Sequence, residues 1–137
     1  MKKFLLIVIV LIYTNLYAVS SDFIKNMNYE ITYEEALVKG KKENKNIMIF
    51  IVQKSCPWCR KMEKQTLKKT NIDSLIKKEF IPLIVDEASN NYPKKFEAKL
   101  FPTTYFINTK DETIIAKILG YKNKKDFFNI LKDVSEK

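Results

Sequence analysis

The two cysteines of this chain stand three positions apart, in the sequence Cys56-Pro57-Trp58-Cys59. The apolar residues 46–53 precede them, and a helix-like stretch that begins at Arg60 follows them. A strand followed by a helix would place the sulfur of Cys56 at the helix N-terminus, where unpaired backbone N–H groups and the helix dipole favour a thiolate. Because the thiolate is the form of cysteine that attacks disulfides, this arrangement predicts thiol–disulfide exchange chemistry.

The composition argues against several other kinds of site. The chain has no histidine, which removes histidine acid–base catalysis and most catalytic zinc sites, so we expect no metal. Its two glycines are too few for a Gly-rich phosphate-binding loop, and nothing in the sequence indicates a cofactor. The net charge of +9 comes mainly from lysines spread along the chain. That distribution is typical of a solvated surface, so we expect no nucleic-acid partner.

The first 18 residues have the pattern of a secretory signal peptide. Two lysines follow Met1, residues 4–12 are continuously apolar, and a more polar stretch ends at Ala18. The apolar run is short for a membrane span, which favours cleavage after Ala18, export to the periplasm or the medium, and no stable membrane span afterwards. An uncleaved membrane anchor is the alternative. Residues 19–137 then have the length of a single domain.

The remaining sequence predicts an α/β domain in which strands and helices alternate. Residues 19–30 show little pattern, whereas Thr32 and Glu35 form a capping box in front of a helix over residues 33–44. Strands are expected over 47–53, 80–86, 103–108 and 113–119, and further helices over 57–68, 70–78, near 94–100 and from Asn123 onward. Pro82 fits the second strand only at a position where no ladder hydrogen bond is needed.

A second motif, Phe101-Pro102-Thr103, stands just before the third predicted strand. With this motif and the cysteine pair, residues from about 30 to 135 resemble the thioredoxin family. In that family an X-Pro-Thr motif opens a core strand, its proline is cis, and it faces the CxxC. The resemblance implies a thioredoxin-like fold, with a central mixed β-sheet of about four strands flanked by helices on both faces. The chain looks most like exported members, which are similar to the soluble redox domain of membrane thiol–disulfide interchange proteins.

The resemblance also implies a role for each matching residue. Cys56 would be the nucleophile, and Cys59 would resolve the mixed disulfide. Pro57 would occupy the first helical position, where its missing N–H costs nothing. Trp58 would rim the active-site surface, or it would only pack. The residues expected to shield the sulfurs or to hold an extended substrate segment are Pro102 and its neighbours Phe101 and Thr103.

Two positions depart from the family pattern. Phe50 stands six residues before Cys56, where thioredoxins carry a buried aspartate that assists proton transfer to the second cysteine. Asp86, at the end of a predicted strand, is a candidate replacement. Lys64 stands where thioredoxin has the proline that kinks the CxxC helix.

The sequence leaves the direction of electron flow open. A strong oxidant usually has a histidine between its cysteines to stabilise the reduced thiolate, and Trp58 cannot do this. We therefore expect a reductant or electron shuttle that acts on client proteins with cysteines or disulfides and is kept reduced by a membrane electron donor. An oxidase, an isomerase and a binding module with an incidental CxxC are the alternatives. A purely structural disulfide over so short a loop would constrain the unfolded chain little.

Overall fold

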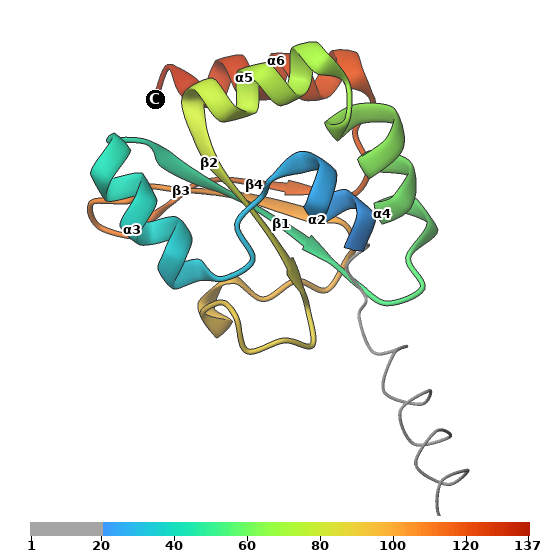
Figure 1. Cartoon of the computed structure of the whole chain (residues 1–137), viewed down its shortest axis with the longest axis horizontal. Helices are drawn as coiled ribbons and strands as arrows, with labels where there is room; N and C mark the ends of the chain where they lie inside the picture. The colour runs from blue at the N-terminus through green and yellow to red at the C-terminus, as the bar shows by residue number, and fades with distance from the viewer. Residues whose placement is uncertain (1–20) are drawn as a thin grey trace, which may run out of the picture.

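The computed structural model describes residues 21–137, and the predicted signal peptide, residues 1–18, lies outside them. Figure 1 shows the helices and strands in their arrangement around one sheet. In chain order they are α2 (Ser21–Met27), α3 (Tyr33–Glu43), β1 (Asn46–Val52), α4 (Pro57–Met62), the π-helix η2 (Glu63–Leu67), α5 (Thr70–Glu79), β2 (Phe80–Asp86), the 3₁₀-helix η3 (Lys94–Phe96), β3 (Thr103–Ile107), β4 (Ile114–Leu119) and α6 (Lys124–Ser135). Within residues 21–137, no helix has the length and apolar character of a membrane span.

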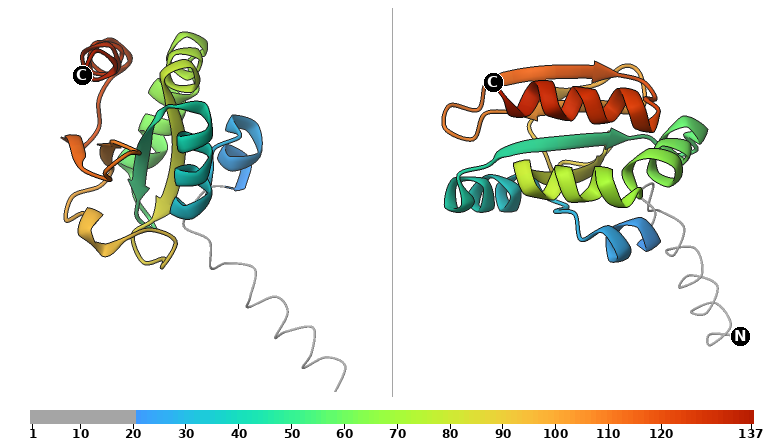
Figure 2. Two further views of the ribbon diagram at one scale, coloured as in Figure 1. Left: turned by 90° about the vertical axis from the view of Figure 1, so that its left-hand side faces the viewer. Right: turned by 90° about the horizontal axis from the view of Figure 1, so that it is seen from above.

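The four strands form one mixed sheet in the order β2-β1-β3-β4. β1 pairs with β2 in parallel and with β3 in antiparallel fashion, and β3 pairs with β4 in antiparallel fashion. Helix α3 lies on one side of the sheet, and α5 and α6 lie on the other (Figures 1 and 2). The predicted α/β fold, a mixed four-stranded sheet flanked by helices on both faces, is therefore confirmed.

The central strand β1 is buried on both faces. Met48, Phe50 and Val52 belong to a core cluster that also contains residues of α4, α5 and α6. The alternate residues, Ile47, Ile49 and Ile51, belong to a second cluster with residues of α3 and Phe96 of η3. This two-sided burial accounts for the continuous apolar run in the sequence, and it places Val52, the last residue of β1, inside the molecule four residues before Cys56.

Residues 19–30 show little pattern in the sequence, and no helix was expected there, yet Ser21–Met27 forms helix α2. Phe23 and Met27 lie one turn apart and are both buried in the core. The helix has seven residues, which is too short for helical periodicity to stand out in the sequence. Tertiary packing of this one apolar pair is what stabilises it.

The segment after α2 also explains how a strand accommodates Pro82. Glu30 donates its backbone N–H to the carbonyl of Pro82 (2.9 Å) and accepts a hydrogen bond from Ile84 (3.0 Å). The backbone groups of Pro82 therefore point outward from the edge strand β2, away from β1. No ladder hydrogen bond to β1 is lost to the proline, as the sequence required.

Two helices differ from their predicted form. The helix expected over 57–68 changes after Met62 into the π-helix η2, where Lys68 donates its backbone N–H to the carbonyl of Glu63 (3.0 Å). The helix expected near 94–100 is only the 3₁₀-turn η3, which Phe96 anchors in the core. The other predicted helices and strands are confirmed to within one or two residues, the usual uncertainty of an element boundary.

One buried hydroxyl lacks a hydrogen bond, which leads to a prediction about stability. Tyr29 is buried, its hydroxyl has no partner among the described residues, and burial raises its pKa. Tyr29→Phe removes the unsatisfied group, so we expect the free energy of unfolding in urea to stay unchanged or to rise by up to about 1 kcal/mol. Tyr33 is the matched control, because it is also buried and its hydroxyl donates a hydrogen bond to Glu112 Oε1 (2.8 Å). Tyr33→Phe should lose about 1 kcal/mol. Equal losses in both variants would contradict the prediction.

Candidate active site

Cys56 is the N-cap of α4, at the point where the chain leaves β1 and enters the helix. Pro57 occupies the first position of that helix. The sulfur of Cys56 accepts a hydrogen bond from the backbone N–H of Cys59 (3.1 Å), as a capping oxygen would in an ordinary helix. A negative charge on this sulfur would therefore meet a backbone donor and the positive end of the helix dipole.

Cys56 and Cys59 are joined by a disulfide. Cys56 is 9% exposed and Cys59 is fully buried. An incoming thiol or disulfide therefore reaches the sulfur of Cys56 more easily, while Cys59 is placed to attack it from inside. This difference in exposure matches the roles that the family resemblance implies for the two cysteines.

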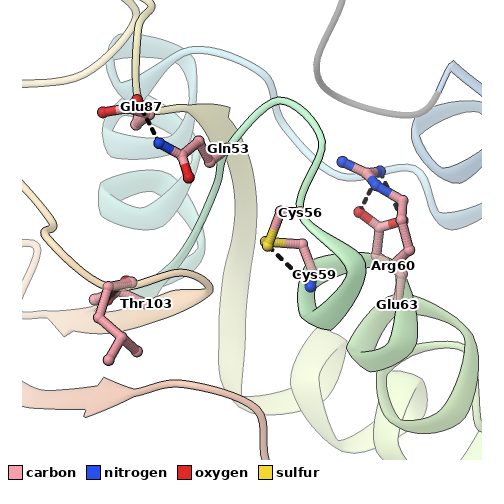
Figure 3. The surroundings of a disulfide bond; sticks show 8 residues. Gln53, Cys56, Cys59, Arg60, Glu63, Glu87 and Thr103 are labelled. Carbon is pink, nitrogen blue, oxygen red and sulfur yellow. Dashed lines mark hydrogen bonds and ion pairs between the residues drawn. A yellow bond between two sulfur atoms is a disulfide. The ribbon is translucent and has the colours of Figure 1, made fainter.

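The disulfide sulfur lies on the side of the cysteine pair that faces Thr103, the first residue of β3, which follows the cis-proline loop (Figure 3). The Phe101–Pro102 peptide bond in this loop is cis, as the resemblance implied. Thr103 is fully buried and donates its hydroxyl to the carbonyl of Leu100 (2.6 Å). Phe101 is half-buried and packs against both core clusters. The loop is thus held in place from inside.

Trp58 lies on the outer surface of α4 and is 54% exposed. Its indole packs against Tyr121, with ring centroids 5.6 Å apart. The ammonium group of Lys61 lies 4.8 Å from the centroid of Trp58 and 4.9 Å from that of Tyr121. Trp58 therefore packs against Tyr121 and also remains exposed close to the cysteines. The two predictions for this residue, a place at the rim of the site and a packing role, are compatible.

The positions considered for a carboxylate that assists proton transfer to Cys59 lie in different parts of the structure, and the first of them is apolar. Phe50, at the position of the missing aspartate, is fully buried in the same apolar cluster as Cys59. Asp86 is half-buried at the end of β2, and its carboxylate accepts a hydrogen bond from the backbone N–H of Ala88 (2.9 Å). The structure adds Glu63, a buried carboxylate four residues after Cys59, which the sequence analysis did not single out.

Glu63 forms an ion pair with Arg60. The single nitrogen Nη1 of Arg60 donates to both carboxylate oxygens, at distances of 2.7 and 2.9 Å. Figure 3 shows this pair on the flank of α4, beyond the disulfide. Burial raises the pKa of the Glu63 carboxyl above its ordinary value, and the nearby cations Arg60, Lys68 and Lys64 oppose the shift only in part. Arg60 is thus paired with Glu63. The buried carboxyl group of Glu63 is a titratable acid on the flank of α4.

Three residues of this site were not among those predicted: Lys61, Glu63 and Tyr121. The signal for Lys61 was its position three after Trp58, which places both side chains on one side of a helix. A glutamate four residues after a buried cysteine carries a similar helical signal. No local pattern could have pointed to Tyr121, because it comes from the far end of β4.

Among residues 21–137, no group of three or more histidine, cysteine or acidic side chains could hold a metal ion.

The raised pKa of Glu63 predicts a characteristic dependence of stability on pH. Between the unfolded and folded pKa values, the folded protein binds more protons than the unfolded chain, so stability must fall as pH rises through this window. Glu63→Gln keeps an oxygen for Arg60 but cannot ionise. We expect the stability of the wild type, relative to Glu63→Gln, to decrease as pH is raised from acid toward neutral in urea denaturation series.

The exposed glutamate Glu136 serves as the matched control, and Glu136→Gln should leave the wild-type profile in place. A wild-type stability that instead rises with pH relative to Glu63→Gln would mean that attraction to Arg60 outweighs burial, contrary to the prediction.

Comparison with known proteins identifies the family to which this sequence is similar. A thioredoxin-like domain family matches residues 33–135. Spermatogenesis-associated protein 20 of Rattus norvegicus is 36% identical over 53 residues, a stretch that covers 39% of this chain and 7% of that protein. The chain thus spans a small fraction of the length of this curated relative.

Solved structures share the fold at low sequence identity. A thioredoxin from Thermus thermophilus superposes with a TM-score of 0.68 at 19% identity, covering 77% of this chain and 85% of its own. The C-terminal domain of Neisseria meningitidis DsbD in its oxidised form gives a TM-score of 0.61 at 16% identity. This superposition covers 76% of this chain and 97% of the DsbD domain. The family match extends from the first residue of α3 to the last residue of α6 and includes the cysteine pair and the cis-proline loop. The chain therefore belongs to the thioredoxin-like family.

Proposed function

We propose that this protein is an exported thiol–disulfide oxidoreductase that exchanges disulfides with client proteins through Cys56 and Cys59, acting as a reductant or electron shuttle. The observation that carries the proposal is the sulfur of Cys56, which lies at the start of α4, accepts a backbone N–H and is the more exposed of the pair. The thioredoxin-like family and the similarity of the fold to thioredoxin support a redox role.

The exchange proceeds in two displacements. In the reduced protein, the Cys56 thiolate attacks one sulfur of the client disulfide, forming a mixed disulfide and releasing the other client sulfur as a thiolate. Cys59 then loses its proton and attacks the Cys56 sulfur, which closes the internal disulfide and releases the second client thiol. The client gains two electrons and the cysteine pair loses two. A membrane electron donor, as the second partner, would return the pair to the dithiol.

The direction of electron flow follows from what stands between the cysteines. Pro57 and Trp58 bring no charge that would hold the Cys56 thiolate, so the reduced form has less stabilisation than in an oxidant with a histidine there. The helix N-terminus is then the main source of stabilisation. This arrangement favours a reductant or shuttle over an oxidase or isomerase.

The loop from Phe101 to Thr103 is the proposed docking site for the client segment. Thr103 is buried and bonded to Leu100, so its contribution is to hold the loop in shape. The carbonyl of Pro102 is already used by the backbone N–H of Gly120 (2.8 Å). The half-buried Phe101 is then the residue of this loop that we propose to contact the client segment.

The disulfide chemistry is tested by reduction of insulin in the presence of dithiothreitol, followed by turbidity. The wild-type domain should accelerate the reaction, and Cys56→Ser should lower the rate to that without protein. Cys59→Ser leaves the attacking sulfur in place but removes the resolving one, so it should trap mixed disulfides with clients through Cys56. A wild-type rate equal to that of Cys56→Ser would instead favour a thioredoxin-fold binding module whose CxxC is incidental.

The export proposal rests on the basic and apolar start of the chain and is tested separately. N-terminal sequencing of the protein recovered from an expressing bacterium should show a chain that begins near Val19, in the periplasmic or medium fraction. A protein that retains Met1 and sediments with membranes would support the anchor instead.

A further inference from the structure

Lys61 holds a cation over two aromatic rings beside the disulfide. Its ammonium group lies within 4.9 Å of the ring centroids of both Trp58 and Tyr121. Each distance is in the range of a cation–π interaction. We call these three side chains the aromatic–lysine platform. The sequence has a single tryptophan, so Trp58 also serves as a built-in probe of this surface.

The platform is fixed to both parts that frame the cysteines. Gly120, with φ of 74°, ends β4 and donates its N–H to the carbonyl of Pro102 (2.8 Å), which ties the chain before Tyr121 to the cis-proline loop. The buried hydroxyl of Thr66 in η2 donates to the carbonyl of Lys122 (2.7 Å), which ties the chain after Tyr121 to the active-site helix. Tyr121 is therefore held on both sides, and its ring forms a firm support for Lys61.

The charge of Lys61 is not neutralised by a carboxylate. Among the described residues, no ion pair forms between Lys61 and an acidic side chain. Glu63, the acid two residues after Lys61 in the sequence, is paired with Arg60 instead. Aromatic rings position a cation without cancelling its charge. The ammonium group thus remains able to pair with an anion from outside.

We propose that the aromatic–lysine platform selects client segments that carry an acidic residue next to the reactive cysteine. The proposal rests on the disulfide exchange proposed above and names a specificity of that same site. A client sulfur bonded to Cys56 brings its own chain alongside α4, and Trp58 lies two residues from that bond. An extended chain advances about 3.3 Å per residue. A carboxylate one or two residues from the client cysteine then lies within about 7 Å of the bonded sulfur along the chain, and in this proposal it pairs with Lys61, while a lysine there would be repelled.

The test uses three matched peptides with a single cysteine, flanked on both sides by glutamate, glutamine or lysine and carried as the mixed disulfide with 2-thiopyridine. The reduced protein forms its internal disulfide, and the peptide thiol and thiopyridone are released, so thiopyridone absorbance gives the rate. The wild type should cleave the glutamate peptide about two- to fivefold faster than the glutamine peptide, as expected for an exposed ion pair. The lysine peptide should be slowest.

Lys61→Met keeps an apolar stem over the rings but removes the charge, so the glutamate and glutamine rates should become equal. Lys64→Met is the matched control, because Lys64 is an exposed lysine three residues further along the same helical stretch. It should keep the wild-type preference. Rates with uncharged dipyridyl disulfide correct for any change in the reactivity of Cys56 itself.

The outcomes separate the two proposals. A glutamine peptide that the wild type cleaves no faster than Cys56→Ser does would overturn the proposed function. Normal cleavage of that peptide without a glutamate preference, or an equal loss of preference in Lys61→Met and Lys64→Met, would overturn the platform proposal alone.

Trp58 fluorescence gives an independent measurement of binding. The peptides used for it carry serine in place of their cysteine, so no disulfide can form. The glutamate peptide should perturb the emission of the oxidised protein at lower concentration than the lysine peptide. Equal perturbation by both would also count against the platform.

Discussion

The burial of β1 on both faces is the constraint on which the rest of the structure depends. Apolar side chains of this strand alternate between two core clusters, so the strand cannot shift by one residue without exchanging the clusters. The chain leaves β1 at Val52 and enters α4 at Pro57 after a short turn. The position of Cys56 is therefore set by the packing of the sheet.

The same packing makes the two cysteines chemically unequal. Cys56 lies at the edge of the core, where a helix N-terminus can stabilise a negative sulfur. Cys59 is enclosed by the apolar cluster that also contains Phe50, and an apolar environment disfavours a charged sulfur. Cys56 and Cys59 thus differ because of their positions in the fold, and this difference supports the separate roles that we propose for them. The buried Glu63, held by Arg60 on the flank of α4, is the nearby group whose protonation is itself shifted by burial.

Two hydrogen bonds between loops and the helical segment connect parts of the site that lie far apart in sequence. Gly120 bonds to Pro102, and Thr66 bonds to Lys122, so the cis-proline loop, the end of β4 and the active-site helix form one unit. The π-helix η2 presents Thr66 toward the segment after β4. It begins at Glu63 and includes Lys64, where thioredoxin has its kinking proline. In this protein the helix changes to π geometry at these residues without a proline.

The sequence by itself determined the local features of this protein: the strand before Cys56, the helix that starts at Pro57, the capping by Thr32 and Asn123, and the motif around Pro102. Each depends on residues within a few positions of one another, through alternation, helical spacing or a cap. Only the tertiary structure decided that Ser21–Met27 is helical, that α4 ends in a π-turn, and that Tyr121 joins Trp58 and Lys61. These depend on contacts between distant segments, which a local pattern does not contain.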